Sequence, residues 1–385
     1  MTKFAHMADC HLGGWRNTEI QELNLESFRR AIDICIKEKV DFVLIAGDLF
    51  DSAYPPIEVL KEVFHIFSKL KEARIPCYII AGSHDYSVSG KTFLDVLEKS
   101  GFCINVHNQE MKDDTIYLNP IIHENIAIYG YPGRKSGLEI QDIRKIKLNE
   151  SPLFKIFMLH TTLNCVKGNI PMESVDESKL PYADYYALGH VHVDFQYDKI
   201  VYPGPLFPNN FQELLDLQGG GFYIVDLEKN NSLIRYDIKL KDVVIIELEI
   251  KDALAATDII ISEINKRNLK DKIVLLKLKG KLEKGKTSDI GFSQIEEEII
   301  KKGAYAYLKN NSDLKSEEAS IEIETDKMED IESQIINIVL KENPSKLNNL
   351  VLPLINALSM EKQEDEKTAI FESRLFDEIK KIVNI

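Results

Sequence analysis

The amino-acid sequence predicts an α/β fold that carries a small second domain and a helical C-terminal segment. In residues 1–242, apolar runs of strand length alternate with amphipathic helical patterns, which is typical of a sheet covered by helices. Residues 243–312 repeat this alternation on a smaller scale, and residues 331–385 contain helical patterns alone. A chain of 385 residues is long enough for about two or three domains.

The elements of the first domain follow from the spacing of its apolar residues. Residues 42–46 are an uninterrupted apolar run of strand length, whereas Phe28, Ile32 and Cys35 recur at helical spacing. The same two patterns predict strands at residues 4–8, 41–46, 77–81, 126–130, 155–159, 185–188 and 221–227, and helices at residues 20–39, 57–72 and 92–99.

Residues 243–312 are predicted to form a second, small α+β domain. Its expected strands are residues 243–250, 272–279 and 304–309, and its expected helices are residues 253–266 and 293–302. Residues 313–330 are polar and acidic, which indicates a linker. The helical stripes of residues 331–385 are too few to build a core, so they are expected to bind a partner or to dock on the main body.

The charge argues against one class of protein. A net charge of −14 disfavours a protein that grips nucleic acid with a broad basic surface. More than half of the excess lies in residues 310–385, which hold 17 acidic and 9 basic side chains. An enzyme that works through metal ions stays compatible with this balance, because divalent cations change the local field.

The lack of targeting patterns and the cysteine usage predict a cytoplasmic protein. No apolar run approaches the roughly 18 residues of a membrane span, and the N-terminus has no signal-peptide pattern. The five cysteines are an odd number and form no CxxC pair, which suggests reduced thiols.

Five loops carry metal-binding side chains at the point where an apolar strand stops. They begin at Asp9-Cys10-His11, Gly47-Asp48, Gly82-Ser83-His84-Asp85, Leu159-His160 and Gly189-His190-Val191-His192. Sites in α/β sheets form at the carboxyl ends of the strands, so we expect these side chains around one crevice. Carboxylates and imidazoles together suit Mn²⁺, Fe or Zn²⁺. The motifs supply six good ligands, which are Asp9, His11, Asp48, His160, His190 and His192. Six ligands are more than one ion needs, which predicts a two-metal site for phosphoester cleavage.

The order of these motifs resembles the calcineurin-like metallophosphoesterase superfamily. Within it, residues 7–13, 46–51 and 185–192 are similar to the DNA double-strand-break repair nucleases of the SbcD type, as are Tyr202-Pro203-Gly204 and residues 221–226. The resemblance implies a two-sheet sandwich flanked by helices, followed by a small capping domain and a helical segment that binds a partner.

The resemblance also implies roles for individual residues. One ion would be held by Asp9, His11, Asp48 and His192, and the second by Asp48, Ser83, His160 and His190. His84 would be the catalytic acid or transition-state stabiliser in an in-line attack on a phosphodiester. Two Mn²⁺ ions per subunit are expected, with Mg²⁺, Fe or Zn²⁺ as alternatives.

Two positions depart from the family pattern. Ser83 stands where the family normally has Asn, whose carboxamide reaches further and is a better neutral ligand, so the second ion is expected to bind more weakly. Asp51 stands where many relatives have His, which adds negative charge near the site. Both departures bear on the rate more than on the fold.

Two further sets of residues are candidates for phosphate contacts. Arg16, Lys91, Arg134 and Lys135 lie near the site loops, although ordinary solvated charge explains each of them as well. Residues 280–287 read GKLEKGKT and match the phosphate-binding pattern GxxxxGK[ST]. Only 98 residues follow this segment, without an apolar run that ends in Asp, so nucleotide binding there is disfavoured.

The favoured function is a two-metal DNA exonuclease or endonuclease that processes double-strand-break ends in the cytoplasm, in association with the nucleoid. The resemblance implies a homodimer formed through helices near residues 57–99, and an SMC-like coiled-coil ATPase partner of the SbcC type. One alternative is a catalytically weakened scaffold that binds DNA ends, which Ser83 favours. The other is a metallophosphoesterase of small phosphodiesters, which would not need residues 243–385.

Overall fold

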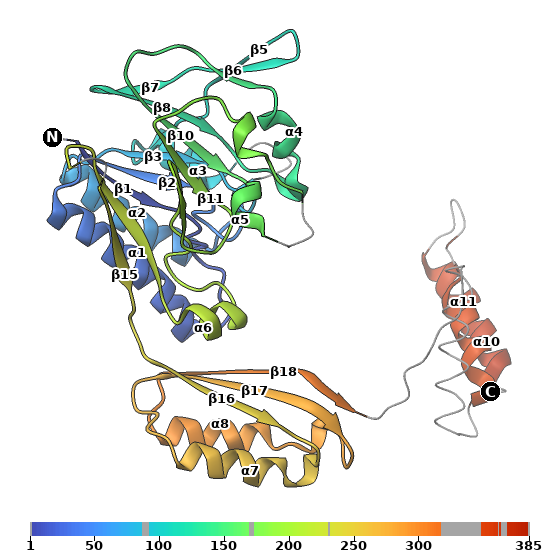
Figure 1. The fold of residues 1–385 in the computed structure, drawn as a ribbon. Coiled ribbons are helices and arrows are strands. Elements are labelled where there is room, and N and C mark those ends of the chain that lie inside the picture. Colours follow the sequence, from blue (N-terminus) through green and yellow to red (C-terminus); the bar gives the residue numbers. More distant parts are fainter. Residues whose placement is uncertain are drawn as a thin grey trace. The chain divides into compact units, whose positions relative to one another are not determined.

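The computed structural model describes residues 2–86, 92–168, 173–229, 232–316, 348–360, 362 and 368–383 (Figure 1). The chain divides into two compact units, Met1–Ser316 and Glu317–Ile385. Within the described residues, no helix combines the length and the apolar character needed to cross a membrane.

Two six-stranded sheets form the larger part of the first unit. The first has the order β15-β14-β1-β2-β3-β4 and the second the order β12-β13-β11-β10-β8-β7. The strands of the first sheet are β1 (Lys3–Met7), β2 (Phe42–Ala46), β3 (Cys77–Ile80), β4 (Ile104–Asn105), β14 (Gly220–Asp226) and β15 (Ser232–Ile238). Those of the second are β7 (Ile121–His123), β8 (Ile126–Tyr131), β10 (Phe154–His160), β11 (Tyr185–Gly189), β12 (Phe195–Tyr197) and β13 (Ile200–Tyr202).

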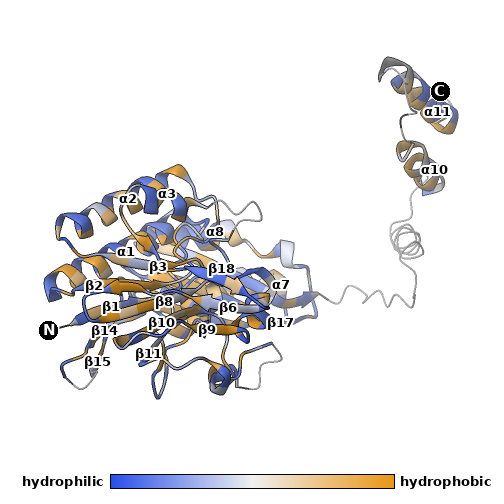
Figure 2. Cartoon of the chain, turned by 90° about the horizontal axis from the view of Figure 1, so that it is seen from above, coloured by the Kyte–Doolittle hydropathy of each residue, from blue (hydrophilic) through white to orange (hydrophobic). Residues whose placement is uncertain are grey.

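The two sheets pack face to face, which confirms the predicted sandwich. One buried cluster takes Phe4 and Phe42 from the first sheet and Ile128, Ile156 and Tyr185 from the second. The rings of Phe4 and Tyr185 meet edge to face, with centroids 5.3 Å apart. Strand β2 is buried along its whole length, which explains why it is an uninterrupted apolar run in the sequence and appears hydrophobic in Figure 2.

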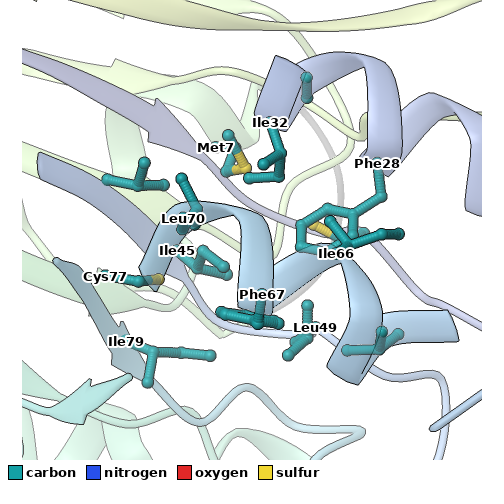
Figure 3. Packing of buried hydrophobic residues seen from close by; sticks show 14 of the residues in the cluster. Met7, Phe28, Ile32, Ile45, Leu49, Ile66, Phe67, Leu70, Cys77 and Ile79 are labelled. Carbon is teal, nitrogen blue, oxygen red and sulfur yellow. The ribbon is translucent and has the colours of Figure 1, made fainter. Parts of the chain in front are cut away.

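Helices α1 (Thr18–Glu38), α2 (Ile57–Glu72) and α3 (Phe93–Lys99) cover the outer face of the first sheet. The first begins where the Asn17 side chain accepts a hydrogen bond from the backbone of Ile20, and it ends at Lys39 in the left-handed conformation. Phe28 of α1 and Phe67 of α2 pack above Ile45 of β2, as Figure 3 shows.

The outer face of the second sheet is covered by short elements. These are α4 (Glu139–Ile143), α5 (Asn164–Lys167) and a three-stranded sheet of β5 (Gln109–Lys112), β6 (Thr115–Leu118) and β9 (Ile146–Leu148). The sequence patterns did not predict this small sheet, because its strands are short and β5 is fully exposed.

A third sheet follows in the same unit. It consists of the parallel strands β16 (Val243–Glu249), β17 (Ile273–Leu282) and β18 (Ala306–Ser316), connected by α7 (Ala253–Asn265) and α8 (Phe292–Lys301). On the face opposite α7 and α8, the buried residues Ile273 and Leu275 pack against Ile20 and Leu23 of α1 and Leu214 of α6 (Phe211–Leu217). Strand β18 includes the first four residues of the predicted linker 313–330. The division of the chain into domains stays a prediction.

The second unit contains helices α10 (Asn348–Leu358) and α11 (Thr368–Val383). These two helices contact each other. The predicted helical stripe that begins at residue 331 lies outside the described residues.

The core beneath α2 predicts a large effect of one substitution. Phe67 is fully buried and its ring lies 5.8 Å from that of Phe28, so Phe67→Ala should lower the free energy of unfolding by about 3–5 kcal/mol. His65→Ala, on the exposed side of the same helix, should change it by less than about 0.5 kcal/mol. Urea unfolding followed by circular dichroism measures both; equal effects would contradict the packing described for α2.

Candidate metal centre

The predicted site residues gather at the carboxyl ends of five strands, which are β1, β2 and β3 of the first sheet and β10 and β11 of the second. The loops after β1 and β2 are hydrogen-bonded to each other, with Asp9 N donating to Gly47 O and His11 N to Asp48 O. Asp9, His11, Asp48 and His190 all have positive φ, between 43° and 93°. Such backbone is unfavourable for residues with a Cβ, and its presence at four positions of one site is typical of a functional centre.

Two glycines allow these loops to approach one another. A Cβ at Gly47 would lie 2.2 Å from Nδ1 of His160, and a Cβ at Gly82 would lie 2.2 Å from Oδ1 of Asp48. Both positions therefore require glycine because a candidate ligand occupies the space of the missing side chain. The GD and GSHD motifs of the sequence contain these two glycines.

Three overlapping sets of side chains have ligand atoms within 4.8 Å of one another. The sets are Asp9–His11–His192, His11–Asp48–His84 and Asp9–Asp48–His160. Asp9, His11, Asp48 and His160 are all buried. Because Asp9, Asp48 and His11 are each shared between two sets, the donors can serve two neighbouring ions, as the sequence predicted.

Hydrogen bonds fix the orientation of three of these imidazoles. Nδ1 of His11 lies 3.1 Å from Asp51 Oδ1, Nδ1 of His160 lies 2.9 Å from the Ala46 carbonyl, and Nδ1 of His192 lies 2.9 Å from Glu213 Oε1. Carbonyl and carboxylate oxygens are acceptors, so each Nδ1 carries hydrogen and donates it. In the neutral ring, Nε2 is then left with its lone pair.

The three Nε2 atoms face other acceptors. His11 Nε2 lies 3.1 Å from His192 Nε2, and His160 Nε2 lies 3.0 Å from Asp48 Oδ2. The second carboxylate oxygen of Asp9 is buried and has no hydrogen-bond partner among the described residues. Opposed acceptors of this kind require a cation between them, either a proton or a metal ion, and ligation requires the neutral imidazole. The donor set therefore fits divalent metal ions.

The charges of the cluster perturb one another strongly. Burial raises the pKa of the Asp9 carboxyl, although His192 and His160 oppose this shift. Burial would also raise the pKa of Asp48, but His160 beside it outweighs burial and holds that pKa below its ordinary value. For His160, burial lowers the pKa, yet Asp48 dominates and raises it to about 10. The two carboxylates thus stay ionised only with compensating positive charge.

His190 and Ser83, the remaining predicted ligands, lie at the edge of the cluster. The backbone N–H of His190 donates to Asp9 Oδ1 at 2.9 Å, and its ring centroid is 5.1 Å from that of His160. Burial and the neighbouring His160 lower the pKa of His190 to about 4, which keeps this imidazole neutral. Ser83 Oγ lies 3.5 Å from Asp48 Oδ2. Among the described residues, His190 does not belong to the three close donor sets.

His84 lies at the solvent side of the cluster. Its side chain is 46% exposed, and its ring meets that of His11 edge to face at 4.7 Å. Nδ1 of His84 lies 3.0 Å from the carbonyl oxygen of Asp51 and so donates to it. The neighbouring Asp85 points the other way and accepts hydrogen bonds from the backbone of Leu49, Phe50 and Gly82. Asp85 therefore holds the loop that presents His84.

The profile of the family described as calcineurin-like phosphoesterase matches residues 2–194, half of the chain. The chain belongs to the calcineurin-like phosphoesterase family. The family predicted from the motifs is thereby confirmed.

Several curated relatives share this family. The chain is 28% identical over 310 residues to the DNA double-strand break repair protein Mre11 of Methanocaldococcus jannaschii, which covers 77% of each chain. It is 30% identical over 258 residues to Mre11 of Methanopyrus kandleri, covering 61% of this chain and 56% of that relative. It is 29% identical over 254 residues to the uncharacterized metallophosphoesterase YhaO of Bacillus subtilis, covering 61% of this chain and 59% of that relative. The match thus spans little more than half the length of the last two relatives.

The predicted phosphate contacts lie in different surroundings. Arg16 and Lys135 are exposed, and Lys91 lies outside the described residues. The Arg134 guanidinium forms an ion pair with Asp142 at 3.0 Å within its own loop region. An ion pair of this kind explains Arg134 without DNA.

The GKLEKGKT segment does not have the conformation of a phosphate-binding loop. Gly280, Lys281 and Leu282 belong to β17, where they pair with Leu314, Lys315 and Ser316 of β18. A phosphate-binding loop must leave its backbone N–H groups free to surround the phosphates and must lead directly into a helix. The next α-helix, α8, begins only at Phe292.

One functional residue was missed in the sequence. Glu213 of α6 accepts the hydrogen bond from His192 and also bonds Asn209 N and Asn210 Nδ2 at the start of the helix. The sequence signal was the pattern Asn210-x-x-Glu213, a helix-capping box, which gave no reason to connect it with His192. The hydrogen bond to Glu213 and the charge of Asp9 outweigh burial and raise the pKa of His192 to about 9.

Removal of Glu213 should weaken metal binding. A carboxylate that accepts from a ligating histidine typically contributes a factor of about 10–100 in metal affinity, so Glu213→Ala should weaken Mn²⁺ binding by that factor. Glu213→Gln, which keeps an acceptor but not the charge, should have a smaller effect. Isothermal titration calorimetry of the full chain measures both affinities.

Gln212→Ala is the matched control, because Gln212 is exposed on the same helix and bonds only Asp216 there. Its Mn²⁺ affinity should equal that of the starting protein. Unchanged affinity in Glu213→Ala would show that His192 does not depend on this carboxylate.

Proposed function

We propose that this protein is a two-metal phosphodiesterase that cleaves DNA and processes double-strand-break ends. The observation that carries the proposal is the set of opposed acceptors on His11, His192, His160 and Asp48, which suits two cations at one site. The names of the Mre11 relatives support DNA as the substrate. The same proposal places the protein in the cytoplasm, in association with the nucleoid.

The residues divide between binding and proton transfer. Asp9, His11, Asp48 and His192 would hold one ion, and Asp48, Ser83, His160 and His190 the other. Two bound ions, Mn²⁺ by preference, supply Lewis-acid stabilisation of charge on the phosphate. Glu213, Asp51 and the Ala46 carbonyl orient the imidazoles, so that the ligand geometry exists before the substrate binds.

His84 is suited to assist the departing oxygen. Since Nδ1 donates to the Asp51 carbonyl, the proton that His84 can transfer is on Nε2 of the protonated ring. The exposure of the side chain leaves that atom accessible to a substrate. His84 is therefore assigned the role of general acid or hydrogen-bond donor in the transition state.

A second candidate function follows from Ser83. Its hydroxyl is 3.5 Å from Asp48 and donates weakly to it, so Ser83 is a shorter and poorer ligand than the Asn of relatives. Weak occupancy of the second position would turn the protein into a scaffold that binds DNA ends without efficient cleavage.

Metal stoichiometry and cleavage separate the two functions. The starting protein should bind two Mn²⁺ ions and cleave linear DNA, and Ser83→Asn should bind the second ion more tightly because Asn adds a carboxamide ligand. Calorimetry gives the stoichiometry, and gel analysis of end-labelled linear DNA gives the rate. Asp33→Asn, on the exposed face of α1, is a control that should leave both unchanged.

The other outcomes are equally informative. Fewer than two ions in the starting protein, with cleavage gained in Ser83→Asn, would favour the scaffold. Hydrolysis of a small chromogenic diester without cleavage of DNA would contradict the nuclease.

The proposal includes two protein contacts. An SMC-like coiled-coil ATPase would bind the C-terminal helices, of which α11 exposes Phe376. A second copy of the chain would bind near residues 57–99, where Ile57 and Val96 are 77% and 44% exposed. Exposed apolar side chains of this size are typical of interaction surfaces.

Deletion of residues 331–385 tests the first contact. The truncated protein should cleave DNA at the rate of the full chain, because the candidate ligands all precede residue 193. It should no longer bind the ATPase in a pull-down with the purified partner. Retained binding would contradict the assignment of the partner site to these helices.

A further inference from the structure

A cavity of about 290 Å³ adjoins the metal centre on the side of His192. His192 itself lines it, together with Pro203 and Pro205 after β13, Leu217 at the end of α6, and Ile238 at the end of β15. One side chain is therefore both a candidate ligand and part of the cavity wall. A substrate whose phosphate lies at the metal centre has this cavity directly beside it.

The charged groups of the wall are already paired. Arg235 bonds Asp237 Oδ1 at 2.8 Å and the Pro203 carbonyl at 2.9 Å, and lies 3.3 Å from Asp194. Lys239 forms an ion pair with Asp242 at 2.9 Å. Since both cations have carboxylate partners, the cavity offers a phosphate little net positive charge. A neutral group suits it better.

The remaining wall combines apolar faces with polar edges. Pro203, Pro205, Leu217 and Ile238 are the apolar residues of the wall, and Gln218 is its uncharged polar side chain, next to Gly219 and Gly220. At Gly220 the chain passes so close that a Cβ would lie 2.2 Å from the Pro205 carbonyl. A flat group with two apolar faces and a polar edge matches these walls, and a nucleobase has this chemistry.

We propose that this cavity, the His192 cavity, receives the base of one of the two nucleosides joined by the scissile phosphate. The inference rests on the proposed function, since it takes DNA as the substrate. A base that enters the cavity leaves the stack of the duplex, and contacts with the wall offset the loss of stacking. The site would then recognise DNA by a nucleoside as well as by its phosphate.

Abasic substrates test the proposal by kinetics. Linear DNA is prepared intact, or without the base on the 5′ or the 3′ side of the scissile phosphate. The starting protein should cleave one of the two abasic forms at least about tenfold more slowly than intact DNA, since burial of the apolar surface of a base contributes a factor of about that size. In Leu217→Trp, whose indole fills the cavity, the intact-to-abasic ratio should fall to near one.

Leu254→Trp is the matched control. It makes the same change on α7, where Leu254 is 68% exposed. Its ratio of cleavage rates for intact and abasic DNA should equal that of the starting protein. Leu217→Ala removes part of the wall without added bulk and should reduce the ratio partially. A Mn²⁺ titration of each variant reports whether His192 has kept its position. A ratio that Leu217→Trp leaves unchanged overturns the proposal, as does a ratio near one for both abasic forms in the starting protein.

Equilibrium binding separates failure of the cavity from failure of the nuclease. With Mn²⁺ present, deoxyadenosine 5′-monophosphate should bind at least about tenfold more tightly than deoxyribose 5-phosphate, and Leu217→Trp should abolish the difference. Equal affinities, or a difference that survives Leu217→Trp, overturn the cavity assignment. Absence of DNA cleavage by the starting protein contradicts the proposed function instead. The binding comparison then still shows whether the His192 cavity receives a base.

Discussion

The centre of this structure depends on one electrostatic constraint. Imidazole nitrogens that have lone pairs are turned toward each other and toward buried carboxylates, at separations of 3.0–3.1 Å. In a low-dielectric interior, such acceptors repel unless a cation lies between them. The fold maintains this unfavourable arrangement because Nδ1 of each of these imidazoles donates a hydrogen bond to an oxygen atom. The ligands are therefore oriented by the fold itself.

The fold provides that support through parallel strands. β1, β2, β10 and β11 end at the same edge of the sandwich, so residues far apart in sequence come together without long side chains. The loops must then turn sharply, which explains the positive φ of Asp9 and Asp48 and the close approach at Gly47 and Gly82. The buried sheet core, with residues such as Ile45 and Phe67, offsets this local strain.

The sequence predicted that these side chains gather, because their positions follow directly from local patterns. Asp9, Asp48 and His160 each end an apolar run, and that position alone fixes the edge of the sheet on which they lie. Glu213 could not be predicted in this way, because its partnership with His192 depends on where the short helix α6 packs. The ion pair of Arg134 could not be predicted either, since its partner Asp142 is set by the three-dimensional course of the loop.

The net charge of −14 has a consequence for how such a protein meets DNA. Affinity cannot come from a general positive field, since the long-range interaction between this chain and a polyanion is repulsive. Under the proposed function, attraction would be local, from cations held at Asp9 and Asp48 that replace negative charge by positive charge where the phosphate binds. Affinity for DNA would then depend on metal occupancy. A weaker ligand at position 83 would accordingly affect the binding of DNA as well as the rate of cleavage.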